Sequence, residues 1–267
     1  MTNTPPDSPR PKLDTSVPHS ARIWNFWLGG KDNFEIDRIV GEQTSAVMPD
    51  MVPTARAIRG FLKRSVTYLA GDAGVRQFLD IGTGLPTAEN THEVAQRVAP
   101  ESKIVYVDND PLVLVHARAL LTSSPEGACD YIDADVHDPE TILEKAGRTL
   151  DFTQPVAVML LAIIHFILDD GEAYAVVKRL LDAVPSGSYM AMVHAVHSPA
   201  TDAAIRQWNE VGTPKMCART EEEIRRFFDG LELLEPGLVP VALWRPEAGE
   251  PNLDAGVGGL CGVGRKA

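Results

Sequence analysis

Residues 78–84 (FLDIGTG) constrain the fold more than any other part of this 267-residue chain. Their apolar run carries an acid, Asp80, directly ahead of Gly82 and Gly84. Glycines let the backbone turn tightly and approach a ligand closely at the end of a strand. A second apolar run, 104–107, ends in Asp108, where an acid binds the hydroxyls of a ribose. The two runs therefore predict parallel strands whose carboxyl ends hold a nucleoside.

The acid in the turn decides between two nucleoside cofactors. A dinucleotide fingerprint has a third glycine where this chain has Thr87, and it has no carboxylate at the position of Asp80. S-adenosylmethionine carries an ammonium group that such a carboxylate can bind, whereas a pyrophosphate offers no such partner. The alternative is that Asp80 only caps the turn. The spacing of Asp80 to Asp108, and to a third acid, favours S-adenosylmethionine over NAD.

The third acid follows another short apolar strand, 129–132. Asp135 is placed to accept a hydrogen bond from the exocyclic amine of adenine, while Val136 packs on the face of the ring. The alternative for such an acid is a helix N-cap, but Asp138 ahead of Pro139 fills that role better. We therefore expect an adenine at Asp135 and Val136. The remaining residues expected to contact the cofactor are Gly82, Thr83, Gly84, Asn109 directly after Asp108, and Ala162 just beyond the fourth strand.

Apolar strands alternate with helix-length segments over residues 75–196. The expected strands are 75–81, 104–107, 129–132, 156–161 and 189–193. This alternation predicts a doubly wound α/β fold, with a parallel sheet covered by helices on both faces. A helix over 87–98 carries one apolar stripe for the sheet, and its N-terminus should face the cofactor.

Composition excludes several classes of function. A net charge of −12 disfavours nucleic-acid binding, because neutralising phosphates requires clustered Lys and Arg. Three distant cysteines predict neither a disulfide framework nor a metal site. No apolar run approaches the length of a membrane span or forms a signal-peptide core, so we expect a cytoplasmic protein that binds a small molecule. The sequence is compatible with a monomer or a homodimer.

Four motifs resemble one known family. They are 28–34 (LGGKDNF), 80–87 (DIGTGLPT), 105–111 (VYVDNDP) and 227–233 (FFDGLEL). The chain from about Ser20 onward is similar to the class I S-adenosylmethionine-dependent methyltransferases. Within them it resembles the actinobacterial group once called domain of unknown function 574.

The resemblance implies a Rossmann-like sheet of seven strands with the last strand antiparallel. The sixth and seventh strands would come from 231–244 and 256–264 as a C-terminal hairpin. Residues 1–19 carry five prolines and predict a disordered tail. Residues 20–70 predict a helical cap, and 71–267 would form the methyltransferase core.

Three histidines follow predicted strands and are candidate general bases: His165 after the fourth strand, and His194 and His197 after the fifth. His165 lies in a strongly apolar run, 160–167, so a buried structural histidine is the competing interpretation.

The segment 24–34 predicts a lid over the cofactor. Trp24 and Trp27 are three residues apart and would share a helical face, either lining the acceptor pocket or packing the cap on the core. Lys31 and Asn33 form a polar run that would reach the methionine end of the cofactor. Trp208, after the fifth strand, is a further candidate for acceptor binding, with core packing as the alternative.

The leading hypothesis is a methyltransferase that acts on the oxygen or nitrogen of a small molecule, in specialised metabolism. The alternative is a methyl-donor-binding sensor or regulator with little transferase activity. An open acceptor pocket would favour catalysis, whereas aromatic side chains that fill the space above the sulfonium would favour regulation.

Overall fold

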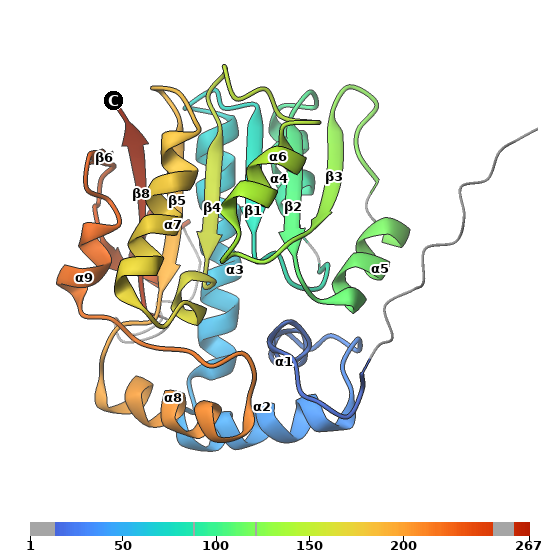
Figure 1. Ribbon diagram of the computed structural model, residues 1–267, viewed down its shortest axis with the longest axis vertical. Helices are drawn as coiled ribbons and strands as arrows, with labels where there is room; N and C mark the ends of the chain where they lie inside the picture. The colour runs from blue at the N-terminus through green and yellow to red at the C-terminus, as the bar shows by residue number, and fades with distance from the viewer. Residues whose placement is uncertain (1–13, 88, 121, 248–258) are drawn as a thin grey trace, which may run out of the picture.

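Five parallel strands lie side by side in one mixed sheet (Figure 1). The computed structural model describes residues 14–87, 89–120, 122–247 and 259–267. The strands are β1 Gln77–Ile81, β2 Lys103–Asp108, β3 Ala128–Asp133, β4 Ala157–Leu161, β5 Tyr189–His194, β6 Leu231–Leu233, β7 Val239–Pro240 and β8 Leu260–Lys266. Their order is β3-β2-β1-β4-β5-β8-β6, with β7 paired to β8, and β8 runs antiparallel to β5 and β6. The doubly wound fold with an antiparallel last strand is therefore confirmed.

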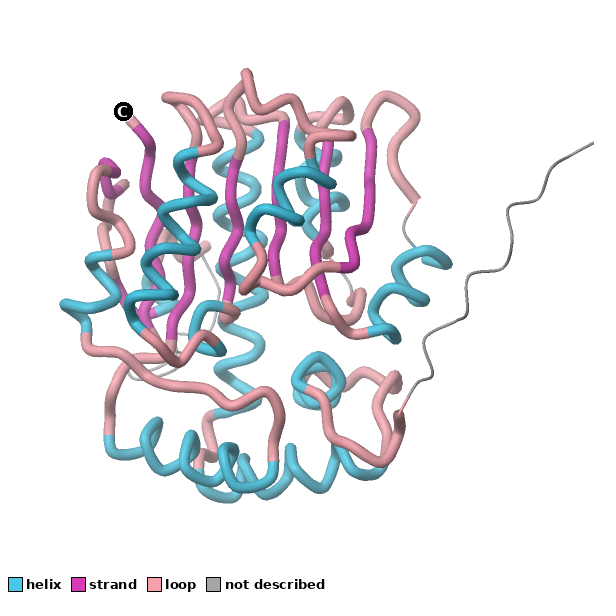
Figure 2. The backbone as a smooth tube through the Cα atoms, in the orientation of Figure 1, coloured by secondary structure: helices cyan, strands magenta, loops and turns pink. Residues whose placement is uncertain are grey.

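Helices cover both faces of the sheet and the carboxyl ends of its strands (Figure 2). The helices are α1 Ser20–Trp27, α2 Glu35–Val47, α3 Met51–Ala70, α4 Thr91–Val98, α5 Pro111–Leu120, α6 Pro139–Ala146, α7 Asp170–Asp182, α8 Pro199–Val211 and α9 Glu221–Arg226, with 3₁₀ turns η1 Ile164–Phe166 and η2 Val241–Leu243.

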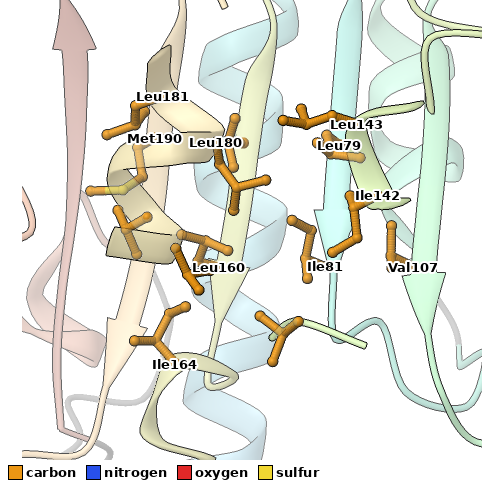
Figure 3. Close-up of a cluster of buried hydrophobic side chains, with 14 of the residues drawn as sticks. Leu79, Ile81, Val107, Ile142, Leu143, Leu160, Ile164, Leu180, Leu181 and Met190 are labelled. Carbon is orange, nitrogen blue, oxygen red and sulfur yellow. The ribbon is translucent and has the colours of Figure 1, made fainter. Parts of the chain in front are cut away.

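Side chains of β1 alternate between two buried cores, as a central strand requires. Leu79 and Ile81 face a cluster that includes Ile142 of α6 and Leu180 of α7 (Figure 3). Phe78 faces the opposite cluster, with side chains of α3 and α4. Burial on both faces explains why this strand is apolar in sequence apart from Gln77 and Asp80.

The helix expected over 87–98 begins later, at Thr91. Asn90 and Glu93 form a capping box, in which the backbone N–H of Asn90 donates to Glu93 Oε2 over 2.8 Å. This cap satisfies the first free N–H groups of a helix that starts at residue 91, so the helix begins there.

The sheet edge is completed by the C-terminal strands. Register pairs Leu231 with Lys266 and Val239 with Cys261, so β6 and β7 both flank β8. Positions 256–258 of the expected seventh strand, and positions 1–13 of the expected tail, lie outside the described residues.

Helices α1, α2 and α8 form a layer across the carboxyl ends of the parallel strands (Figure 1). Helix α2 packs against both α1 and α8, although α8 follows β5 late in the chain. Helix α3 belongs to two environments, because Met51 lines the space under this layer while Leu69 packs in the core behind the sheet. The layer thus combines N-terminal helices with a segment from the second half of the chain.

Leu69→Ala tests the core between α3 and the sheet, where Leu69 is 0% exposed. We expect the free energy of unfolding to fall by about 2–5 kcal/mol, because a cavity replaces packed methyl groups. Leu168, which is 55% exposed, gives a matched control, and Leu168→Ala should change stability by about 0.5 kcal/mol or less. Chemical denaturation measures both, and equal losses would contradict this packing.

Candidate functional site

One cavity of about 410 Å³ lies between the carboxyl ends of the strands and the overlying helices. Its walls come from α1, from α3, from the ends of β1, β2, β4 and β5, and from α8. Parallel sheets of this topology bind ligands at the carboxyl ends of their strands. The site lies where the connections after the neighbouring strands β1 and β4 run to opposite faces of the sheet. The location alone therefore marks the cavity as the candidate site.

The glycine turn forms the floor of the cavity. Gly82 and Gly84 have φ of +76° and +69°, a left-handed conformation that a side chain would strain. A Cβ at position 82 would lie 2.6 Å from the side chain of Ile163. The Gly82 amide donates to Val107 O over 2.9 Å, which joins the turn to β2. Thr83 also lines the cavity.

Asp108 fixes the position of this turn. Its carboxylate accepts a hydrogen bond from Gly84 N at 2.7 Å and another from Asp110 N at 2.9 Å. Asp108 is only 8% exposed, and its burial raises the pKa of the carboxyl. The carboxylate borders the cavity, where ribose hydroxyls can donate to its remaining lone pairs.

The segment ahead of α1 closes this side of the site. His19 Nδ1 lies 2.9 Å from Asp110 Oδ2, and the His19 amide donates to Asp37 Oδ1 over 3.0 Å. His19, Ser20 and Ala21 all line the cavity. Sequence reasoning missed these residues, because it assigned His19 to the tail and nothing local links it to Asp110.

Asp80 is a buried acid beside an arginine. It is 5% exposed, and Thr91 Oγ1 donates to its Oδ2 over 2.6 Å. Burial raises the pKa of Asp80 to about 6, although Thr91 and the charge of Arg59 both act to lower it. Such a carboxylate gains from a cationic ligand, because an opposite charge favours its ionised form.

Arg59 of α3 brings a positive charge to the same part of the cavity wall. Its Nη2 donates to Glu89 O over 2.7 Å, and burial lowers its pKa. The sequence places Arg59 among four basic residues at 56, 59, 63 and 64, which predict a solvated face. Sequence reasoning therefore missed it, since only the path of α3 in the fold places Arg59 at the cavity, Arg56 at the surface and Arg64 in the interior.

The residues expected at the adenine, and Asn109 beside them, also meet at the cavity. Asn109 Nδ2 donates to Asp135 Oδ2 over 2.8 Å, and the His137 amide donates to Asp135 Oδ1 over 2.9 Å. Asn109, Asp135 and Val136 all border the cavity, and Val136 is 8% exposed. A polar acceptor and an apolar side chain are thus adjacent, as the face and edge of an adenine require.

The end of β4 contributes a strained residue and a histidine. Ala162 has φ of +61°, uncommon for alanine, and its amide donates to Val193 O over 3.0 Å. His165 is 8% exposed, and its Nδ1 is buried with no hydrogen-bond partner within the described parts of the chain. Burial, aided by His194 and Arg219, lowers the pKa of His165 well below its usual value. His165 is therefore neutral at pH 7.

The other two candidate bases do not line the cavity. His194 is 0% exposed, and its Nε2 accepts from Arg219 Nη1 over 2.8 Å. Because a guanidinium only donates, the ring proton lies on Nδ1, 2.8 Å from Ala195 O. Burial lowers the pKa of His194 to about 4. His197 Nδ1 instead lies 2.8 Å from the exposed Asp202. Of the three histidines, only His165 reaches the cavity.

The residues predicted to form a lid or to bind the acceptor also divide into those that line the cavity and those that do not. Trp24, Trp27 and Trp208 line the cavity. Lys31 is exposed, and Asn33 Nδ2 donates to Asn25 Oδ1 over 2.9 Å. Neither Lys31 nor Asn33 borders the cavity. Asn33 is held by hydrogen bonds to Asn25 of α1 and to Gly30 O, which a sequence pattern cannot distinguish from contacts to a ligand.

The described ranges contain neither a membrane-spanning helix nor a group of metal ligands. No helix there is both long enough and apolar enough to cross a membrane. Among those residues, His, Cys, Asp and Glu side chains also form no group of three or more that could hold a metal ion.

Comparison with known proteins gives a family and two similar structures. Residues 6–267 match a family described as S-adenosyl methyltransferase. A DUF574 family protein from Streptomyces avermitilis MA-4680 is 44% identical with a TM-score of 0.91, over 96% of this chain and 100% of that chain. A protein from Thermobifida fusca YX, named provisionally as a methyltransferase, is 46% identical with a TM-score of 0.88, over 97% and 98%.

A more distant structure shares the fold alone. Magnesium protoporphyrin IX methyltransferase from Synechocystis PCC 6803, with bound S-adenosylmethionine, is 11% identical with a TM-score of 0.52, over 92% of this chain and 90% of that chain. No curated protein matches the chain.

The raised pKa of Asp80, about 6, predicts how S-adenosylmethionine binding depends on pH. A bound ammonium favours the ionised carboxylate, so affinity is highest above this pKa and falls as pH drops through it. Between pH 7 and pH 5 we expect a loss of about tenfold, measured by calorimetric titration.

Asp80→Asn provides the control for this dependence. The amide keeps an acceptor for Thr91 but cannot ionise, so the variant should bind more weakly and lose the Asp80 part of the pH profile. Asp108 remains in both proteins, and therefore the difference between the two profiles isolates Asp80. Identical profiles would refute the assignment.

Proposed function

Because the chain belongs to the S-adenosyl methyltransferase family, we propose that it methylates an oxygen or nitrogen atom of a small molecule. The chain is an S-adenosylmethionine-dependent methyltransferase, and our proposal concerns the class of molecule that accepts the methyl group. The supporting observation is that one cavity joins the acid-lined edge of the sheet to an apolar space under α1 and α8. Cofactor and acceptor can therefore share a single enclosure. A place in specialised metabolism and in the cytoplasm stays a prediction.

The residues present fit the cofactor from end to end. Asp80 would hold the ammonium of the methionine end, and the strained Ala162 lines the same cavity. Arg59 would hold the carboxylate. Asp108 would accept from the ribose hydroxyls, and Asp135 from the adenine amine. A buried acid and a half-buried arginine in one wall match a ligand that carries both charges at one end.

When bound, S-adenosylmethionine supplies a methyl group whose bond to sulfur breaks as the acceptor atom forms its new bond, leaving S-adenosylhomocysteine. The protein's own contribution is mainly positioning and exclusion of water, because the enclosed walls fix the acceptor's orientation. His165 would accept the proton that the acceptor loses and pass it to water. Its neutral imidazole is the form that can do so.

The form of the cavity supports catalysis over regulation. Trp24, Trp27 and Trp208 lie in its wall, and the space between them and the sheet is continuous with the acidic edge. A sensor would need no such enclosed space next to the expected sulfonium. The regulatory hypothesis would gain if the protein bound the cofactor but released no S-adenosylhomocysteine with any acceptor.

Arg59→Met tests the cofactor assignment. In calorimetric titrations the unaltered protein should bind S-adenosylmethionine and S-adenosylhomocysteine but not NAD. The variant should bind both at least about tenfold more weakly, because a charged hydrogen bond to the carboxylate is lost. Methylthioadenosine, which lacks the amino-acid end, should bind both proteins equally.

Arg56→Met is the matched control, since Arg56 is an exposed arginine on the same helix and does not line the cavity. It should bind every ligand as the unaltered protein does. Tight binding of NAD, or an equal loss of methylthioadenosine affinity in the Arg59 variant, would oppose the assignment.

His165→Gln tests the proposed base. With an acceptor found by its release of S-adenosylhomocysteine, we expect kcat to fall about 10²-fold while cofactor affinity stays unchanged. Burial keeps His165 neutral, so titration of this residue should not lower kcat of the unaltered protein between pH 8 and pH 6.5. An unchanged kcat would leave His165 with a structural role.

A further inference from the structure

The cavity has two chemically different halves. Its sheet side carries Asp80, Asp108, Asp135 and Arg59, the groups assigned above to the cofactor. The other half, here called the acceptor chamber, lies under the helical layer. It is lined by Trp24, Trp27, Met48, Met51, Thr54 and Trp208. The acceptor must occupy this chamber if the cofactor occupies the sheet side.

The chamber offers no counter-charge to an ionic acceptor. Within the described chain, none of the cavity-lining residues on α1, α2, α8 or the loop 213–216 is acidic or basic, and Arg59 of α3 is the group assigned above to the cofactor carboxylate. An anionic acceptor would lose its hydration there without gaining an ion pair. A cationic acceptor would meet the sulfonium of the cofactor in the same enclosure. Charge therefore selects a neutral molecule.

The shape and chemistry of the walls select a flat ring system. The ring centroids of Trp24 and Trp27 are 5.8 Å apart with the rings edge to face, and those of Trp27 and Trp208 are 6.4 Å apart. Aromatic walls gain energy from a second aromatic ring, and the thioethers of Met48 and Met51 adapt to its outline.

The indole N–H groups already have partners within the protein. Trp27 Nε1 donates to Gly41 O over 3.1 Å, and Trp208 Nε1 donates to Pro214 O over 2.7 Å. These bonds hold both rings in place and leave carbon surface for the ligand. The two tryptophans thus provide packing area and no polar recognition.

Two buried polar atoms in the cavity wall have no protein partner among the described residues: Oγ1 of Thr54 and Nδ1 of His165. Thr54 is 5% exposed and His165 is 8% exposed. A buried hydroxyl without a hydrogen bond is costly, and a ligand group that bonds it removes that cost. Thr54 lies on α3 and His165 lies after β4, so the two residues reach the cavity from different elements.

From these contacts we infer that the methyl acceptor is a neutral, planar aromatic molecule with one hydroxyl or amine near His165 and a second hydrogen-bonding group near Thr54. This inference rests on the proposed methyltransferase function and narrows its substrate class. The ring would pack against the tryptophans, and the two polar groups would fix which of its atoms meets the methyl group.

The first test measures probe binding directly. Three of the four tryptophans in the chain line the cavity, so quenching of intrinsic fluorescence reports occupation of the chamber. The probes are 2,7-dihydroxynaphthalene, its charged relative 7-hydroxynaphthalene-2-sulfonate, and the saturated, non-planar decahydronaphthalene-2,7-diol. Each is titrated with and without S-adenosylhomocysteine. We expect the aromatic diol to bind at least about tenfold more tightly than either relative.

Thr54→Val tests the second polar contact. It should weaken binding of 2,7-dihydroxynaphthalene about five- to tenfold and leave binding of 2-naphthol, which lacks the second hydroxyl, unchanged. The melting temperature should not fall, because the substitution removes a buried hydroxyl that has no partner. Unchanged 2-naphthol binding also shows that the variant is folded. Thr67→Val, at an exposed threonine of the same helix, should bind both probes normally.

The outcomes separate this inference from the function on which it rests. Preference for the sulfonate or the saturated diol, or no binding of the aromatic diol, overturns the inference even if S-adenosylmethionine binds. Failure of S-adenosylmethionine to bind overturns the transferase function, while the order of probe affinities still decides the character of the chamber. Equal losses for diol and naphthol in the Thr54 variant overturn the contact assigned to Thr54.

Discussion

The hydrogen bond from the Gly84 amide to the Asp108 carboxylate, 2.7 Å long, is the constraint on which the site depends. It ties the turn after β1 to the end of β2. The bond thus fixes the relative positions of two segments that lie 24 residues apart in the sequence. The same carboxylate holds the Asp110 amide and thereby the start of the next loop. Asp110 in turn meets His19, which brings the N-terminal segment over the site. One buried acid thus organises three segments of the backbone.

Burying charges at this edge is costly, and the fold shows how the cost is met. Asp80 and Asp108 both have raised pKa values because burial penalises their ionised forms. Backbone amides, Thr91 and the charge of Arg59 offset part of that penalty. A cationic ligand can offset the rest of this penalty, because its charge stabilises a carboxylate that water no longer solvates. The two large apolar clusters on either face of the sheet supply the stability that permits such a site.

The layer of α1, α2 and α8 gives the cavity its second chemical character. Contact between α2 and α8 joins the beginning of the chain to a segment that follows β5. The layer places three tryptophans opposite the acidic edge, where a shorter connection after β5 would leave that edge open to water. Water exclusion and recognition of the acceptor therefore come from the same helices. The chemistry of methyl transfer needs both and asks little else of the protein.

The sequence by itself determined the strands and the acids that end them, because both are local: apolar runs of strand length, glycines that allow positive φ, and Asp80, Asp108 and Asp135 at fixed places after them. Tertiary structure alone decided which polar side chains reach the cavity. Arg59 and Thr54 became candidates, while His194 is held by Arg219 and Asn33 by Asn25 of α1. Their sequence neighbourhoods do not differ in kind from those of residues that line the site. What separates them is which helix face or loop folds over the sheet, and contacts between residues far apart in the chain set that arrangement.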